Sequence, residues 1–352
     1  MTGPLIAVEG LTREFVVKRS LFGAPTAAVK AVDGVSFDIT AGETLALVGE
    51  SGCGKSTVGR LVLGLIAPTS GRVSFDGQDL AAMDAAGTRR FRARAQLIFQ
   101  DPYASLNPRM TIGATLAEPL ALHTDLTSAE RRSRVSELLA TVGLKREHAE
   151  RYPHEFSGGQ RQRIAIARAL AVEPRLIVCD EPVSALDVSI RSQVLNLLKD
   201  LQQRLGLTYL FISHDLAVVK HVADRVAVMY LGRIVETARA KELFASPRHP
   251  YAQALLSAIP VANPGRQRAR RALEGDPPSP IAPPPGCHLH PRCSFARDVC
   301  RRSQPALVAD GTGRSVACHG WSEISGGEAV PQDAAMSPHL ARLVAAFEAA
   351  AI

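Results

Sequence analysis

The sequence predicts an α/β fold built around a mostly parallel sheet. Short apolar runs typical of buried strands occur at residues 43–48 (ETLALV), 175–179 (RLIVC) and 208–212 (TYLFI). Helical patterns separate them at residues 159–170 and 189–205. Strands that alternate with helices along a chain favour parallel βαβ units, and this alternation is the main evidence for the fold class.

Length and composition bound the class of protein. The chain has 352 residues, which allows roughly two domains at ~100–200 residues each. Lys plus Arg number 41 and Asp plus Glu 34, a formal net charge of +7, with 46% hydrophobic residues. This composition is globular, and no stretch approaches the ~18 apolar residues that span a bilayer. The N-terminal residues (MTGPLIAVEG) lack the pattern of a secretory signal, so we expect a cytosolic chain.

The first strand leads into a glycine-rich loop. Residues 49–56 read GESGCGKS, which fits G-x-x-x-x-G-K-[ST] between a predicted strand and a predicted helix, the context of a P-loop. Glycines let backbone N–H groups curve around phosphate, and the helix N-terminus adds partial positive charge. We predict that Lys55 binds the β- and γ-phosphates, that Ser56 ligates Mg²⁺ and that Thr57 contacts the α-phosphate. The nucleotide-binding residues predicted here are Gly49, Ser51, Gly52, Cys53, Gly54, Lys55, Ser56 and Thr57.

The second strand, 175–179, is followed by two acids. Asp180 at its end is expected to hold Mg²⁺, directly or through water. Glu181 would then face the γ-phosphate and orient or deprotonate the attacking water, a role that contributes ~10²–10⁴-fold. Two acids alone would be interpreted as solvated loop residues; the upstream P-loop favours the catalytic role.

The segment between these strands differs from the rest of the domain in composition and in hydrophobic pattern. Residues from about 104 to 151 are polar, rich in Arg and Glu and helical in pattern, which predicts a helical insertion in the sheet domain. We place a nucleotide-binding domain at residues 1–245, with a helical subdomain over about 101–158.

A composition change near residue 247 predicts a small extension over residues 246–330. Its residues 276–286 (DPPSPIAPPPG) are proline-dense and predict an extended surface segment. A tail over 331–352 follows, in which 337–350 begin with Ser and Pro in the order that favours a helix start.

A third motif points to a family. Residues 156–160 (FSGGQ), with the helix pattern RQRIAIARAL after them, closely resemble the signature motif of ATP-binding-cassette (ABC) ATPases. In that family the motif contacts the γ-phosphate held by the P-loop of a second subunit. The resemblance implies that this role falls to Ser157, Gly158, Gly159 and Gln160.

Further elements of the ABC family occur in the same order. Gln100 matches the Q-loop glutamine, which touches Mg²⁺ or the attacking water; Asp187 (SALD) matches the D-loop at the dimer seam. His214 (FISHD) matches the switch histidine that contacts the γ-phosphate. The resemblance thus implies catalysis by Glu181, His214 and Gln100 and Mg²⁺ ligation by Ser56, Gln100 and Asp180. Phe15 stands where the family stacks an aromatic ring on adenine; a core aromatic is the alternative.

The C-terminal part narrows the family. RHPY at residues 248–251, YAQALLSAIP, the proline run and GCHLHPRC resemble the extension of peptide-importer ATPases, and DPYASLNPRM resembles the dipeptide and oligopeptide permease subgroup, F-type subunit. The resemblance implies an ATP hydrolase that powers peptide import. Related importers of glutathione, nickel and opines share these features, so the solute stays open.

The same resemblance implies partners and a location. It implies a second, different ABC ATPase subunit, two transmembrane permease subunits and, indirectly, a periplasmic or extracellular peptide-binding protein. It places the chain peripherally on the cytoplasmic side of the plasma membrane. A soluble ABC ATPase acting on DNA or ribosomes is disfavoured, because the chain has one cassette and no sustained heptads; we expect no nucleic-acid partner. An inactive regulatory subunit is disfavoured by the intact Lys55, Glu181 and His214.

Four of the six cysteines crowd into the extension: Cys287, Cys293, Cys300 and Cys318. In a cytosolic chain, where disulfides are rare, such a group indicates a metal or cluster site. Zinc sites usually contain C-x₂₋₄-C pairs, which are missing here, whereas four thiolates suit a [4Fe–4S] cluster. Some peptide importers of the subgroup carry such a cluster here, so we predict [4Fe–4S], with Zn²⁺ or free thiols as alternatives.

Overall fold

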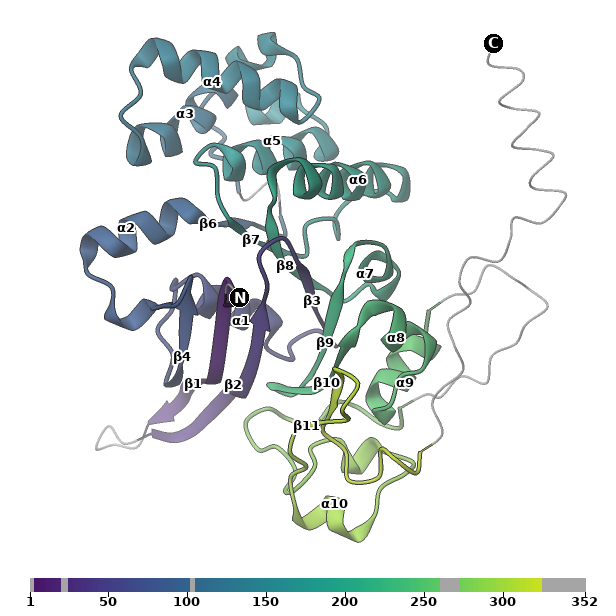
Figure 1. The fold of residues 1–352 in the computed structure, drawn as a ribbon. Helices are drawn as coiled ribbons and strands as arrows, with labels where there is room; N and C mark the ends of the chain where they lie inside the picture. Colours follow the sequence, from purple (N-terminus) through teal and green to yellow (C-terminus); the bar gives the residue numbers. More distant parts are fainter. Residues whose placement is uncertain (1–2, 20–24, 102–104, 260–272, 325–352) are drawn as a thin grey trace, which may run out of the picture.

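The computed structural model describes residues 3–19, 25–101, 105–259 and 273–324, which form a larger and a smaller sheet (Figure 1). The larger sheet has the strand order β11-β12-β10-β9-β3-β8-β7-β6. Its strands are β3 (Thr44–Val48), β6 (Ala95–Ile98), β7 (Leu176–Asp180), β8 (Thr208–Ser213), β9 (Arg225–Tyr230), β10 (Arg233–Arg239), β11 (Val308–Ala309) and β12 (Ser315–Val316).

The centre of the larger sheet is parallel, as predicted. β3 pairs in parallel with β8 and β9, and β7 pairs in parallel with β6 and β8. Every residue of β3 and β8 is buried, which is why these strands appear in the sequence as continuous apolar runs. The predicted strands at residues 43–48, 175–179 and 208–212 are therefore confirmed to within one residue at either end.

The smaller sheet was not predicted. Its order is β2-β1-β4-β5, and its pairings are antiparallel. The strands are β1 (Ile6–Arg19), β2 (Pro25–Ile39), β4 (Ser70–Phe75) and β5 (Gln78–Asp79). The pairing of β1 with β2 carries several register shifts, which interrupt the alternation of polar and apolar residues that a sequence pattern depends on.

Helices cover the sheets as the sequence patterns indicated. α1 (Lys55–Val62) follows β3, α5 (Gly158–Leu170) precedes β7, and α6 (Val188–Leu205) precedes β8. The other helices outside the helical region are η1 (Leu80–Ala82), α2 (Ala85–Arg94), α7 (Leu216–Val222), α8 (Ala240–Ala245), α9 (Pro250–Ser257), η4 (His290–Arg292) and α10 (Asp298–Arg302).

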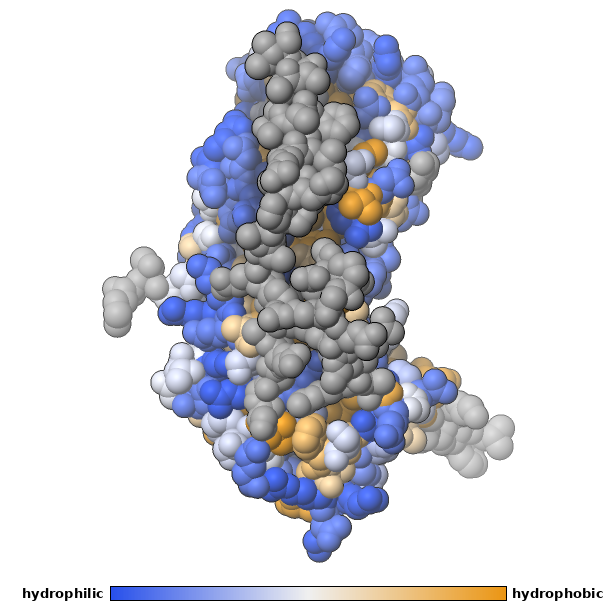
Figure 2. Space-filling view, turned by 90° about the vertical axis from the view of Figure 1, so that its right-hand side faces the viewer, coloured by the Kyte–Doolittle hydropathy of each residue, from blue (hydrophilic) through white to orange (hydrophobic). Residues whose placement is uncertain are grey.

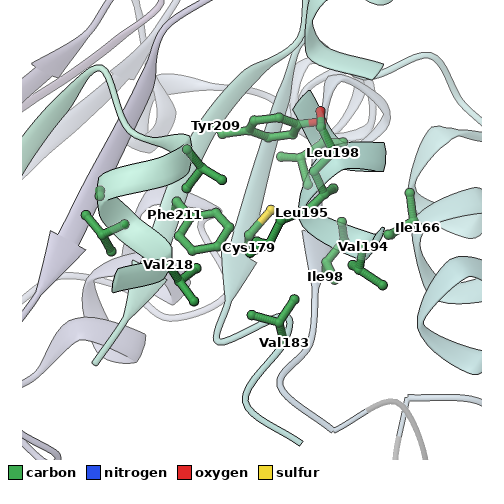
Figure 3. Packing of buried hydrophobic residues seen from close by; sticks show 14 of the residues in the cluster. Ile98, Ile166, Cys179, Val183, Val194, Leu195, Leu198, Tyr209, Phe211 and Val218 are labelled. Atoms are coloured by element: carbon green, nitrogen blue, oxygen red, sulfur yellow. The ribbon is translucent and has the colours of Figure 1, made fainter. Parts of the chain in front are cut away.

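The core beneath α6 fixes the end of β7. Cys179 on β7 and Phe211 on β8 lie in one buried cluster with Leu195 and Leu198 of α6, and Figure 3 shows these side chains facing one another. The Tyr209 hydroxyl in this cluster donates to the carbonyl of Leu198 at 3.0 Å, and close packing of the apolar side chains around it positions the strand ends. The catalytic candidates follow directly from these ends.

Residues between β6 and β7 form a helical region. It contains α3 (Ile112–His123), α4 (Ser128–Thr141), η2 (Arg146–Glu150), η3 (Pro153–Glu155) and α5. These helices gather at the top of Figure 1, away from the smaller sheet. All of these helices except α5 lie within the stretch of about 101–158 in which the sequence predicted a helical subdomain; the domain boundaries themselves remain a prediction.

The C-terminal residues are attached to the edge of the larger sheet. β12 pairs with β10, and the fully buried Glu236 of β10 accepts hydrogen bonds from Arg314 Nη2 at 2.9 Å and from the backbone N–H of His249 at 2.7 Å. Residues 276–286 contain no helix or strand, as their prolines predicted. The predicted tail at 331–352, with its helix at 337–350, lies outside the described residues.

The surface is mixed in polarity. Figure 2 shows hydrophilic residues over most of the visible face, with hydrophobic residues in smaller patches. Among the described residues, no helix combines the length and the hydropathy that a membrane crossing requires.

Candidate active site

The glycine-rich loop between β3 and α1 has the shape that its sequence predicted. Gly54 has φ of 107°, and a Cβ there would lie 1.9 Å from the carbonyl oxygen of Ala31, so only glycine fits. Gly52 also has positive φ, but no atom lies within 4 Å of its Cβ position. Lys55 is 5% exposed, and its ammonium donates to the carbonyls of Gly49 (2.8 Å) and Glu50 (2.9 Å). The space next to Gly52 is therefore open, and the Lys55 ammonium is hydrogen-bonded to the backbone of the loop.

A pocket of about 530 Å³ opens over this loop, a size suited to a small-molecule ligand. Many predicted site residues line it: Ser51, Gly52, Cys53, Gly54, Lys55, Ser56, Thr57, Gln100, Glu181 and His214. Gly49, Asp180 and Phe15 do not line it. A Cβ at Gly49 would lie 2.1 Å from the carbonyl oxygen of Met229, so this glycine serves close packing behind the loop.

The three predicted catalytic side chains meet at one carboxylate. Gln100 Nε2 donates to Glu181 Oε2 at 2.9 Å, and His214 Nδ1 lies 3.0 Å from Glu181 Oε1. They follow the carboxyl ends of β6, β7 and β8, adjacent parallel strands whose ends meet at one sheet edge, where α/β proteins bind ligands. Glu181 has φ of 47°, a strained conformation for a residue with a side chain and one found at functional sites.

Asp180, at the end of β7, is hydrogen-bonded to the residue that follows Lys55 in the P-loop motif. Ser56 Oγ donates to Asp180 Oδ1 at 2.8 Å. Burial raises the pKa of Asp180, while the hydrogen bond from Ser56 opposes the rise. A hydroxyl and a carboxylate at this separation are oxygen donors that Mg²⁺ accepts, and a bound cation would hold the carboxylate ionised. The residues present therefore fit the predicted Mg²⁺.

The signature segment forms a turn of its own. Ser157 Oγ accepts from the backbone N–H of Gln160 at 3.4 Å, and Gln160 Oε1 accepts from the backbone N–H of Ser157 at 3.0 Å, a capping box at the start of α5. A Cβ on Gly159 would lie 2.4 Å from Ile190 Cγ2, so this glycine allows α5 to pack against α6. The four signature residues do not line the pocket of their own chain.

Two further predicted positions lie apart from the pocket. Asp187 is exposed at the N-terminus of α6, where its side chain makes no capping hydrogen bond. Phe15 is 39% exposed and pairs across the smaller sheet with Val29, which does line the pocket. The guanidinium of Arg13 lies 4.7 Å from the centroid of the Phe15 ring. The stacking role of Phe15 stays a prediction.

Sequence reasoning missed one wall of the pocket. The residues concerned are Val29, Lys30, Ala31, Leu231, Gly232 and Pro280. They come from β2, from the β9–β10 turn and from the proline-dense segment. No motif marks them, because only the folding of β2 and the extension against the P-loop brings them together.

The cysteine segment does not form the predicted metal site. Within the described residues, no group of three or more His, Cys, Asp or Glu side chains is arranged to hold a metal ion, and the cysteines are free thiols. Burial raises the pKa of Cys287 to about 11 and raises the pKa of Cys293 and Cys318. The structure does not support the iron–sulfur cluster or the alternative zinc site, and we assign no step to either.

Comparisons with known proteins agree with the geometry. Residues 32–184 match the family described as "ABC transporter", and residues 235–300 match "Oligopeptide/dipeptide transporter, C-terminal region". The chain is 54% identical over 315 residues to the dipeptide transport ATP-binding protein DppF of Escherichia coli, covering 90% of this chain and 94% of that one. It is 53% identical over 319 residues to the probable peptide ABC transporter ATP-binding protein y4tS of Sinorhizobium fredii, covering 91% and 90%.

Solved structures show the same fold. The ATP-binding cassette MJ0796, in a dimeric post-hydrolysis state bound to ADP and Pi, aligns with a TM-score of 0.59 at 28% identity. The alignment covers 67% of this chain and 98% of that one. A second dimeric structure of MJ0796, described as a bacterial ABC transporter cassette, aligns with the same score at 29% identity, with the same coverage.

Proposed function

The chain belongs to the ATP-binding proteins of ABC transporters, in their dipeptide/oligopeptide subfamily, and from this premise we propose that it hydrolyses ATP to power peptide import through a membrane permease. The observation that carries the proposal is the Glu181 carboxylate, bound on one side by Gln100 and on the other by His214, at the mouth of the P-loop pocket.

In the proposed mechanism the P-loop binds the triphosphate of ATP. Backbone N–H groups of the glycine-rich loop would donate to phosphate oxygens, and Lys55 would exchange its two carbonyl acceptors for the β- and γ-phosphate oxygens. Mg²⁺, held by Ser56, Asp180 and Gln100, would neutralise the charge that develops on the phosphates. The wall of Val29, Leu231 and Pro280 is left for the nucleoside.

Hydrolysis then requires a water molecule in line with the γ-phosphorus. The water oxygen bonds to phosphorus, the bond from phosphorus to the β–γ bridging oxygen breaks, and the proton of the water passes to Glu181. Gln100 and His214 hold the carboxylate toward that water through the two hydrogen bonds described above. His214 is exposed and would contact the γ-phosphate.

The signature turn is proposed to act on a second subunit. Its residues do not line the pocket of their own chain, whereas Ser157 is exposed at the start of α5, where helix N–H groups attract phosphate. Two such chains would each complete the other's ATP site, with Asp187 at the seam; the dimeric MJ0796 structures support this arrangement.

We infer the remaining partners from the subfamily. They are a different ABC ATPase subunit, two transmembrane permeases and, indirectly, a peptide-binding protein outside the membrane. The chain would then lie peripherally on the cytoplasmic side. Closure of the ATP sites would move the permeases, and hydrolysis with phosphate release would reopen the sites. The ATP sites would thus have two states, and the γ-phosphate would favour the closed one.

Reconstitution tests the proposal. The complex that co-purifies with the tagged full-length chain is placed in proteoliposomes, and uptake of a labelled dipeptide is measured with ATP and with ADP. We expect uptake with ATP alone. Uptake of glutathione, nickel or an opine, with no peptide uptake, would keep the ATPase and overturn the peptide assignment. Absence of permeases from a complex that turns over ATP would overturn the transporter assignment.

A further inference from the structure

The P-loop is held from behind by the C-terminal extension. Glu50, the second residue of the loop, contacts two side chains of that region. The Tyr251 hydroxyl of α9 accepts a hydrogen bond from the backbone N–H of Glu50 at 2.8 Å. The Arg292 guanidinium of η4 donates from Nη1 to Glu50 Oε2 at 3.1 Å and from Nη2 to Glu50 Oε1 at 3.3 Å. Both the backbone and the carboxylate of one loop residue are therefore fixed by the extension.

This contact is partly buried. The Arg292 side chain is 8% exposed and that of Glu50 29% exposed. Arg292 Nη1 also approaches the Tyr230 hydroxyl at 3.5 Å, and the Tyr230 and Tyr251 rings pack with centroids 4.6 Å apart. A forked guanidinium–carboxylate pair with little water around it has one preferred geometry.

Glu50 is connected to the phosphate site in two ways. Its carbonyl accepts from the Lys55 ammonium at 2.9 Å and from the backbone N–H of Cys53 at 3.3 Å, so a shift of Glu50 moves the lysine and the loop. Its carboxylate is a negative charge on the loop that binds an anion. Unless that charge is neutralised, it repels the triphosphate. Arg292 neutralises it.

We propose that the C-terminal extension is part of the ATP site: Arg292 is a positioning residue that, through Glu50, neutralises and fixes the phosphate-binding loop. The inference rests on the proposed ATP site. Pro280, from the same extension, lines the nucleotide pocket, an independent contact of this region with the site. The extension is itself anchored by the buried Glu236–Arg314 pair and by β12 on β10, so it offers the loop a fixed support.

Equilibrium binding of ATP with Mg²⁺ to the full-length chain tests the inference. Arg292→Gln leaves the Glu50 carboxylate without its partner, and we expect the Kd for ATP to rise about tenfold. Glu50→Gln combined with Arg292→Gln removes both charges, and we expect much of the affinity to return. Arg292→Lys keeps the charge without the fork and should lie between the wild type and Arg292→Gln.

A matched control separates this role from a general effect on the extension. Arg297 forms an exposed pair with Glu323 in the same region, at 2.7 Å, without contact to the loop. Arg297→Gln should leave the Kd for ATP unchanged. In the assembled complex, Arg292→Gln should raise KM for ATP while kcat at saturating ATP stays close to that of the wild type, a split that loss of folded protein does not produce.

Unchanged ATP affinity in a folded Arg292→Gln chain would overturn the inference. If Arg292→Gln does not fold, Tyr251→Phe is the second test, because it removes only the hydroxyl that accepts from the Glu50 N–H. We expect Tyr251→Phe to bind ATP more weakly than the wild type. Unchanged binding would overturn the inference. Lys55→Ala is the reference for the site itself. If Lys55→Ala leaves ATP affinity intact, the proposed ATP site is wrong. If Lys55→Ala weakens ATP binding but the Arg292 and Tyr251 variants do not, the ATP site stands and the inference is wrong.

Discussion

Two glycine-containing turns open two helices in this protein, and they differ in what surrounds them. The P-loop before α1 faces a pocket walled by β2, by the ends of β6 to β8 and by the extension. The signature turn before α5 does not line that pocket, and its polar groups satisfy one another through a capping box.

The glycines of the two turns also differ in role. In the P-loop, Gly54 is required by the adjacent Ala31 carbonyl, and Gly52 leaves room on the pocket side. In the signature turn, Gly159 is required by Ile190 of α6, and Gly158 has only an ordinary contact, with Leu186 at 3.6 Å. Each turn thus has at least one glycine that packing requires and one that keeps a face open. This difference agrees with the proposal that the two turns are complementary half-sites of an ATP site shared between two chains.

The largest expected effect comes from the carboxylate beside the first turn. Glu181→Gln keeps the shape and a hydrogen-bonding group but cannot take a proton, so turnover should fall by about 10²–10⁴-fold while ATP still binds. Turnover is measured as phosphate release by the assembled complex, and ATP affinity is measured by equilibrium binding. Turnover at the wild-type rate would remove Glu181 as the base.

The next effect concerns the P-loop turn itself. Lys55→Ala removes the ammonium from the loop, and we expect ATP affinity of the isolated chain to fall by about 10- to 100-fold. A substitution in the other turn, Gly158→Ala, serves as the control and should leave this affinity unchanged. If both variants bind ATP like the wild type, the distinction between the two turns fails.

A negative charge in the signature turn should reduce turnover of the assembled complex without weakening ATP binding by the isolated chain, in contrast to Lys55→Ala. Gly158→Asp places a carboxylate at the start of α5, where it suits the helix but would repel the γ-phosphate bound by a partner. We expect ATP binding by the isolated chain to be retained and turnover of the assembled complex to fall at least about tenfold. Normal turnover would show that this turn does not meet a partner's nucleotide.

A smaller effect separates the two signature glycines by stability. A methyl group at Gly159 meets Ile190 Cγ2 at 2.4 Å, whereas one at Gly158 meets Leu186 at 3.6 Å. Gly159→Ala should cost about 1–3 kcal/mol of unfolding free energy through overpacking, and Gly158→Ala should be neutral or stabilising by under about 1 kcal/mol. Urea unfolding of both variants compares them; equal stabilities would contradict the packing role of Gly159.

Low pH should destabilise the C-terminal extension that contacts the P-loop. His249 is fully buried, and burial lowers its pKa to about 3 from an ordinary value near 6.5. Between these values the unfolded chain binds the proton and the folded chain does not, so stability falls as pH drops from 6.5 toward 3, by at most about 1.4 kcal/mol per pH unit. Denaturant unfolding of the wild type and His249→Gln across pH 5–7 should show a shallower slope in the variant. Parallel slopes would contradict this.

The sequence by itself determined what depends on neighbours along the chain. The P-loop, the acids after β7, the capped signature turn and the buried strands follow from spacing, periodicity and backbone rules that act over a few residues. The residue order also brought Gln100, Glu181 and His214 together, because the ends of adjacent parallel strands meet at one edge.

The tertiary structure decided what depends on contacts between distant segments. The antiparallel sheet, the pocket wall of Val29 and Pro280 and the role of Gly159 carry no local signal. Four cysteines in one segment predicted a metal site, yet the folded elements that carry them leave no metal-binding group among the described residues. The contact of Arg292 with Glu50 joins residues 242 positions apart. Such pairs follow from the packing of whole elements against one another, which short-range patterns do not encode.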